Sequence, residues 1–322
     1  MNPRERSLYI LALVGLLMSL VMTSLSSFIR LADSGIGCDP WPECQAIYFT
    51  IDEQPGITIA SGDKNKGLRV LHRFMASAFG IVAVLLLVLS TWYRKVVRTP
   101  PTLAIVCFIL TVILALVGMD TPDLLHPVVT LTNLTAGMVT TAVLWLLVLQ
   151  IQTPLMKGEP AGLYLLNLIN IYLVIMVIAS GAWISANFAA GACEGFLDCR
   201  NISGESFQNA FNPMREIQRV GDTLFLGDVQ STIEWSHHLA AVLLCGSLAI
   251  ASYKNFATSN LTTLAIIGLT VGLVIAGTLE SGAGLGSESR QPTLLSAWIH
   301  NFWSMLLLLA VVYQYFQMRE KA

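Results

Sequence analysis

The sequence predicts an all-α membrane protein, with eight transmembrane helices arranged as two tandem four-helix-bundle repeats. Three observations support this fold class: the composition, eight long apolar runs, and a Cys-loop and His-helix pattern that occurs twice. The 322 residues are 55% hydrophobic and 12% charged, with a mean hydropathy of +0.68. Soluble domains have roughly 25% charged residues, and one soluble core could not bury this much apolar surface. A lipid bilayer is therefore the expected solvent.

The eight apolar runs are each long enough to cross a membrane, which takes roughly 20 residues. Because backbone polar groups in lipid must be satisfied internally, continuous apolar runs predict helices rather than barrel strands. The first run is longer than the core of a signal peptide and is expected to be retained. The predicted helices cover residues 8–29, 70–93, 102–119, 128–152, 163–186, 232–253, 260–279 and 293–316.

The orientation follows from the basic residues of short loops, which favour the cytoplasm. The N-terminus, the loops 94–101, 153–162 and 254–259, and the C-terminus lie on one predicted side, with nine basic residues and three acidic ones. Both termini are therefore predicted to be cytoplasmic, and the two long loops 30–69 and 187–231 are predicted to lie outside.

The two predicted halves, residues 1–155 and 156–322, share the same order of features. Each long outer loop opens with a C-x5-C pair, Cys38/Cys44 in the first half and Cys193/Cys199 in the second. A helix that begins with His follows each loop. We therefore predict two parallel repeats of four helices.

The four loop cysteines favour two disulfides, Cys38–Cys44 and Cys193–Cys199, because the outer compartment is oxidising. Thiol–disulfide exchange with a partner is an alternative, and metal binding by two thiolates is a weaker one. Cys107 and Cys245 fall within predicted helices and are expected to act as small buried hydrophobic residues.

Three histidines fall within the first two turns of predicted helices that run from outside to inside, and therefore share one layer near the outer face. They are His72, His237 and His300. An ionisable residue in a membrane helix indicates function. Two imidazoles from two helices of a bundle are common ligands of heme iron. We predict His237 and His300 as such a pair and His72 as a further iron ligand. The alternative is that each histidine only hydrogen-bonds a neighbour or a lipid headgroup.

Polar neighbours of these histidines are candidate cofactor-binding residues. His238 points about 100° away from His237 and cannot serve the same iron. It matches Arg73 in the repeat, and both are predicted polar partners for a heme propionate. At the repeat position of His300, helix four carries Asn133, and an amide binds heme iron poorly. The first half therefore offers His72 as its one strong ligand.

Other residues near the predicted outer boundary have simpler expected roles. His126 precedes Pro127 and is expected to be a solvated loop residue, although it lies two turns before Asn133 and could replace it as a ligand. An interfacial belt is expected for four tryptophans, and lining of a heme pocket is the alternative. They are Trp41, Trp183, Trp235 and Trp298.

The most specific stretches are residues 30–44 (RLADSGIGCDPWPEC), 71–73 (LHR) and 180–182 (SGA) before the second Cys pair. These stretches resemble the heme A synthase family, and the resemblance covers the whole chain. It implies an enzyme that oxidises the C8 methyl group of heme O to a formyl group, giving heme A. It also implies a heme b bound by His237 and His300, and a substrate heme bound in the first half with His72 as a catalytic-site ligand. Cys38 and Cys44 would help to deliver electrons or to hold the heme site.

The chain departs from the family pattern at two positions. Arg69 stands three residues before His72, where the family has Glu, and Asn133 or Thr132 stands where the family has a second His. In the second half, Glu234 precedes His237 by three residues and shares its helix face. Glu234 is therefore a candidate catalytic residue that orients His237 or shuttles protons, and capping of the helix start is the alternative.

The alternative function is a non-enzymatic membrane b-type cytochrome or a heme-binding oxidase assembly factor. A transporter is disfavoured, because no mid-helix carboxylate marks a midplane site. The resemblance implies a bacterial inner membrane protein in contact with lipid, and its candidate partners are a heme O synthase and an outer-face or quinol electron donor. The pI near 6.2 and the absence of a basic patch exclude a nucleic-acid-binding role.

Overall fold

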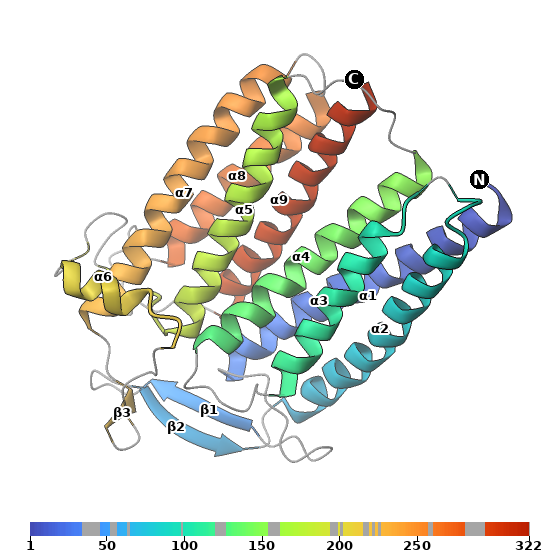
Figure 1. The fold of residues 1–322 in the computed structure, drawn as a ribbon. Coiled ribbons are helices and arrows are strands. Elements are labelled where there is room, and N and C mark those ends of the chain that lie inside the picture. Colours follow the sequence, from blue (N-terminus) through green and yellow to red (C-terminus); the bar gives the residue numbers. More distant parts are fainter. Residues whose placement is uncertain are drawn as a thin grey trace.

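A computed structural model describes most of the chain, and Figure 1 shows its long helices side by side. Both termini lie at one end of the helices, here the termini end, and short strands lie at the other, here the sheet end. The residues that the structure does not describe are 34–45, 52–56, 63–64, 98, 120–126, 154–161, 194–198, 200–201, 215–218, 221–222, 225–226, 257–259, 281–293 and 322.

Eight long helices match the eight predicted runs. The first half contains α1 (Pro3–Asp33), α2 (Lys66–Trp92), α3 (Thr102–Met119) and α4 (Pro127–Gln152). The second contains α5 (Gly162–Ala186), α7 (Asp228–Asn255), α8 (Asn260–Glu280) and α9 (Leu294–Lys321). Seven are long and apolar enough to cross a membrane, and α3 is a shorter apolar helix. The predicted all-α membrane fold class is confirmed, whereas the count of eight spans stays a prediction.

The helices of the two halves pack in the same order. In the first half α1 contacts α2 and α4, and α3 also contacts α2 and α4; in the second, α5 and α8 each contact α7 and α9. The halves meet through α4–α5, α1–α9 and α4–α9. These contacts are symmetric between the halves. When each helix is replaced by its counterpart in the other half, the α4–α5 contact becomes α9–α1 and the α4–α9 contact stays the same. The domain boundary at 155/156 lies outside the described residues and stays a prediction.

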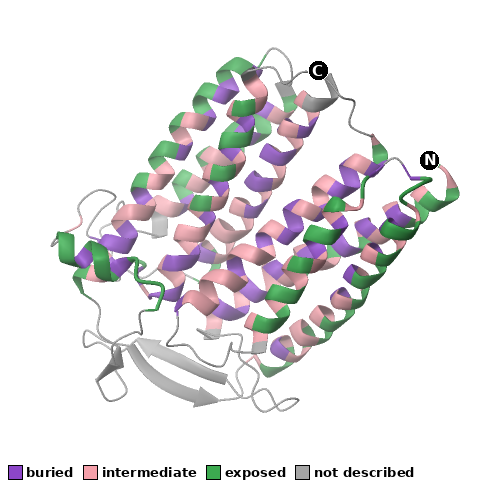
Figure 2. Cartoon of the chain, viewed as in Figure 1, coloured by how far each residue is buried: buried purple, intermediate pink, exposed green. Residues whose placement is uncertain are grey.

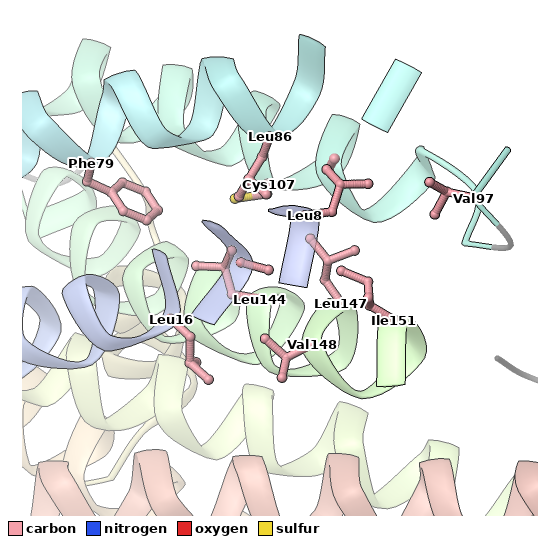
Figure 3. Packing of buried hydrophobic residues seen from close by; sticks show 12 residues of the cluster. Leu8, Leu16, Phe79, Leu86, Val97, Cys107, Leu144, Leu147, Val148 and Ile151 are labelled. Carbon is pink, nitrogen blue, oxygen red and sulfur yellow. The ribbon is translucent and has the colours of Figure 1, made fainter. Parts of the chain in front are cut away.

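The apolar core of the first half gathers near the termini end. Figure 3 shows side chains such as Leu8, Leu86, Cys107 and Leu144 packed between the four helices. Cys107 is fully buried, whereas Cys245 is half-buried. Figure 2 shows buried positions mainly where helices lie next to one another. Many exposed positions are apolar, as expected of lipid-facing surfaces.

A short helix and a small sheet at the sheet end were not predicted. The helix is α6 (Gly204–Ala210), and the strands are β1 (Ala46–Ile51), β2 (Ile57–Gly62), β3 (Arg219–Val220) and β4 (Thr223–Leu224). They form an antiparallel sheet in the order β1-β2-β4-β3. The pairing of β2 with β4 joins the long loop of the first half to that of the second.

Close packing of α8 on α9 depends on Gly272, because the Trp303 ring occupies the place where a Cβ at that position would lie. We expect Gly272→Ala to lower stability by about 1–3 kcal/mol through overpacking. Gly268→Ala on the same helix is the matched control, since its Cβ would meet no atom within 4 Å. Thermal unfolding of both variants in one detergent checks this, and equal midpoints for the two would contradict the packing.

Candidate functional site

The structure brings His237 of α7 and His300 of α9 together at the sheet-end half of the second bundle. Their ring centroids lie 6.5 Å apart, with an angle of 53° between the ring planes. His237 shares a helix face with the buried Leu244 and Leu248, which lie seven and eleven residues further along. His300 is similarly related to Leu307 and Val311. Both imidazoles therefore project into the interior of the bundle.

Each of the two imidazoles lies against a glycine of a neighbouring helix. A Cβ built at Gly181 of α5 would lie 3.3 Å from Cε1 of His237, and one built at Gly277 of α8 would lie 3.3 Å from Cε1 of His300. Carbon atoms pack best at about 3.5–4.0 Å. An alanine in place of either glycine would therefore crowd the imidazole that packs against it.

Ser180 lies against Nδ1 of His237. Its hydroxyl oxygen is 2.8 Å from the carbonyl oxygen of Val177 and 2.8 Å from Nδ1 of His237. With the hydroxyl proton donated to Val177, Nδ1 carries the hydrogen and donates it to Ser180. The lone pair is then on Nε2, the protonation state of an imidazole that binds metal.

The donor set fits a heme iron better than a bare metal ion. In the described part of the chain, no group of three or more His, Cys, Asp or Glu side chains could hold a metal ion. A bare ion usually takes three or four protein ligands, whereas a porphyrin iron takes one or two axial ones.

His238 is buried beside this pair. Its ring centroid lies 6.3 Å from that of His237, at an angle of 53°. Because neighbouring helix residues point in different directions, the ring of His238 is not placed across from His300 as that of His237 is. A role for His238 as a polar partner of a propionate stays a prediction.

Glu234 of α7 fastens the loop that follows α5. The side chain is 3% exposed, and its Oε1 and Oε2 accept the backbone N–H groups of Gly191 at 3.0 Å and Cys193 at 2.7 Å. Gly191 has a φ of 77°, a left-handed conformation that favours glycine. Both carboxylate oxygens bind backbone groups, so the observed contacts give Glu234 a positioning role. Its predicted catalytic role is not tested by these contacts.

The same loop contains a disulfide between Cys193 and Cys199. Ser231 adds to its attachment, because its hydroxyl donates to the carbonyl of Ala192 at 3.2 Å. The predicted Cys38–Cys44 pair lies outside the described residues.

The candidate residues of the first half line the equivalent interior. His72 shares a face of α2 with the buried Phe79 and Leu86, and Asn133 shares a face of α4 with the buried Thr140 and Leu144. Arg69, one turn before His72, is almost fully buried. The guanidinium of Arg73 approaches α3, where its Nη1 lies 3.9 Å from the place of a Cβ at Gly118.

The interfacial belt was the wrong expectation for Trp183. That side chain is buried, and its Nε1 donates to the carbonyl of Ala210 at 2.8 Å. Trp298 joins the two halves, because its Nε1 donates to the carbonyl of Ser24 at 3.1 Å. Trp41 and His126 lie outside the described residues.

The fold and the paired imidazoles define a multi-pass helical membrane protein with a two-histidine site of the kind that holds heme. A family model described as a cytochrome oxidase assembly protein matches residues 9–312, and the chain belongs to this family. The chain is also 26% identical to a heme A synthase from Shewanella oneidensis over 316 residues, which cover 93% of each protein. The resemblance that the sequence motifs predicted is confirmed.

The contacts of Glu234 generate a prediction for the loop. Glu234→Gln would replace one acceptor oxygen with a donor, and one buried N–H group would lose its partner at a cost of about 1–3 kcal/mol. We expect faster hydrogen exchange at Gly191 and Cys193, measured by mass spectrometry. Asp228→Asn, an exposed change on the same helix, is the control and should leave this peptide unchanged. Unaltered hydrogen exchange in Glu234→Gln would argue that Glu234 does not hold this loop in place.

Proposed function

We propose that the protein is a heme-modifying oxidoreductase of the heme A synthase type. It would convert heme O to heme A by oxidising the C8 methyl group to a formyl group. The observation that carries this proposal is the pair of imidazoles from α7 and α9, with centroids 6.5 Å apart and each ring against a glycine. Family membership and the similarity to a heme A synthase add support.

In this proposal the second half would hold a heme b through His237 and His300. Such a heme, when bound, would accept and release single electrons. Ser180 keeps Nε2 of His237 available for the iron through its hydrogen bond to Nδ1. The buried His238 would face a propionate, and Glu234 would hold the loop that covers the site.

The first half would receive heme O, with His72 as an iron ligand. Asn133 takes the position of the second histidine, so only one strong ligand is offered and the other face of the iron stays accessible. Arg69 and Arg73, on either side of His72 in the sequence, would pair with the two propionates, because guanidinium groups match carboxylates well.

The protein would lie in the bacterial inner membrane with both termini in the cytoplasm, as the basic residues of its short loops favour. The heme sites would then be near the outer face. A heme O synthase would supply the substrate from the membrane, and an outer-face or quinol donor would supply electrons. The exposed apolar helix faces would contact lipid.

A second candidate is a non-enzymatic b-type cytochrome or a heme-binding oxidase assembly factor. Asn133 and Arg69 favour it, because both replace residues that the enzyme family usually carries in the first half. The two functions differ in their response to heme O. A cytochrome with only the His237/His300 heme should show no spectral change when heme O is added, whereas an enzyme should bind it in the first half.

The proposed activity predicts a product that mass spectrometry can identify. Purified protein incubated with heme O, a reductant and oxygen should give hydroxylated and formylated heme. His72→Ala should lose this conversion while it keeps the heme of the second half, because the two sites lie in different bundles. Bound heme without any oxidised product in the unsubstituted protein would favour the second candidate.

We predict that substitution of His237 or His300 causes loss of the heme proposed for the second half. His237→Ala and His300→Ala should each weaken heme binding about tenfold or more, since 1.4 kcal/mol corresponds to a factor of ten. Heme content and the low-spin absorption spectrum of the purified protein report this. Ser236→Ala is a matched control, because its hydroxyl bonds the carbonyl of Thr232 within the same helix at 2.7 Å. Full heme retention in both histidine variants would contradict the assignment.

A further inference from the structure

A short apolar stripe at the sheet end is not explained by the proposed heme chemistry. It consists of Phe207 and Phe211 of α6 and its flank, together with Met214, and these side chains are 39%, 48% and 79% exposed. Phe211 follows Phe207 by four residues, about one helical turn, and caps the C-terminal end of α6. Met214 lies in the turn that follows the helix. Gln208 and Asn209, which lie between Phe207 and Phe211 in the sequence, are also exposed, as is Glu205 just before them. The segment is therefore amphipathic on its exposed surface.

We propose that this stripe, Phe207, Phe211 and Met214, is an anchor that inserts into the lipid headgroup region of the leaflet at the sheet end. The proposal concerns lipid contact and does not depend on the heme chemistry.

The orientation of the stripe is fixed by the opposite, buried side of α6. Ser206 is buried and its hydroxyl lies 2.9 Å from that of Thr232 on α7. The carbonyl of the buried Ala210 accepts the indole N–H of Trp183 at 2.8 Å. A capping box between Ser203 and Ser206 closes the first turn of α6. Polar contacts thus hold the start of α6 on α7 and its end on α5, and leave the stripe exposed.

The depth of the stripe follows from its contact with α7. The rings of Phe207 and Trp235 meet edge to face, with centroids 6.2 Å apart. Trp235 begins a face of α7 that continues through the exposed Leu239, Val242 and Ile250 to Tyr253, which is 87% exposed. Eighteen residues at about 1.5 Å each place Trp235 and Tyr253 roughly 27 Å apart. This is close to the hydrocarbon thickness of about 30 Å.

Tryptophan and tyrosine are enriched at the two membrane–water interfaces. Trp235 therefore marks the interface at the sheet end, and Phe207 lies beside it at the same level. The stripe is thus continuous, through the contact of Phe207 with Trp235, with the exposed apolar surface of α7. This is the arrangement of an interfacial amphipathic helix.

Lipid fits the stripe better than a second copy of the chain. Three partly exposed side chains cannot supply the roughly 800 Å² per partner of a stable protein interface. Aromatic and methionine side chains at an interface with lipid need no shape-complementary partner. The anchor would also fix the depth of the site, because His237 follows Trp235 by two residues on the same helix.

The unsubstituted protein in phosphatidylcholine vesicles can test this anchor. A phosphatidylcholine that carries a diazirine near the headgroup end of one acyl chain is photolysed, and peptide mass spectrometry maps the adducts. We expect Phe207, Phe211 and Met214 to be labelled several-fold more than the matched neighbours Gln208 and Asn209. A water-soluble diazirine should reverse that ratio. This reagent controls for differences in intrinsic reactivity between the stripe side chains and those of Gln208 and Asn209.

Two results would overturn the anchor. One is equal lipid labelling of the stripe and of Gln208 and Asn209, with the stripe open to the water-soluble reagent. The other is protection of the stripe from both reagents together with photocrosslinks between two copies of the chain, which would identify a protein partner instead. Heme content does not enter either readout, so failure of the anchor and failure of the proposed function remain distinguishable.

Discussion

Close approach of two helix backbones to two imidazoles is the constraint on which the site depends. Gly181 and Gly277 let α5 and α8 contact the rings of His237 and His300. A glycine inside a helix costs about 1 kcal/mol relative to alanine, but small residues allow membrane helices to pack closely. The separation of the rings is therefore set by the packing of all four helices in the second half. A site of this kind is preorganised, because the rings are confined by backbone rather than by flexible side chains alone.

The two halves combine one packing scheme with different polar residues at equivalent positions. Glu234 stands three residues before His237, whereas Arg69 stands three residues before His72, so the charge at equivalent positions is reversed. His300 and Asn133 likewise occupy equivalent faces of α9 and α4. A buried charge is costly unless it is paired, and Glu234 meets this requirement with the N–H groups of its loop. The difference underlies the proposed division between a resident heme in the second half and a substrate heme in the first.

The sequence allowed the helices and the histidine pair to be predicted, because both follow from local rules. Membrane helices are long apolar runs, and three of them carry His72, His237 and His300 near their sheet ends. Long-range contacts of polar groups were not predictable in this way. The carboxylate of Glu234 reaches a loop more than forty residues earlier in the chain, and Trp183 is buried because α6 folds over it. The pairing of β2 with β4 was missed for the same reason, since these two strands lie in different halves.

Contacts at the sheet end connect the two halves. Arg30, at the end of α1 in the first half, donates to the carbonyl of Ser185 at 2.9 Å, and its guanidinium lies 5.1 Å from the ring centre of Phe188. A cation is favourable at this place, since the carbonyls at the end of α5 carry partial negative charge. The loop bound by Glu234 begins at that same helix end. Arg30 on α5 and the pairing of β2 with β4 are therefore two separate connections between the halves at the sheet end.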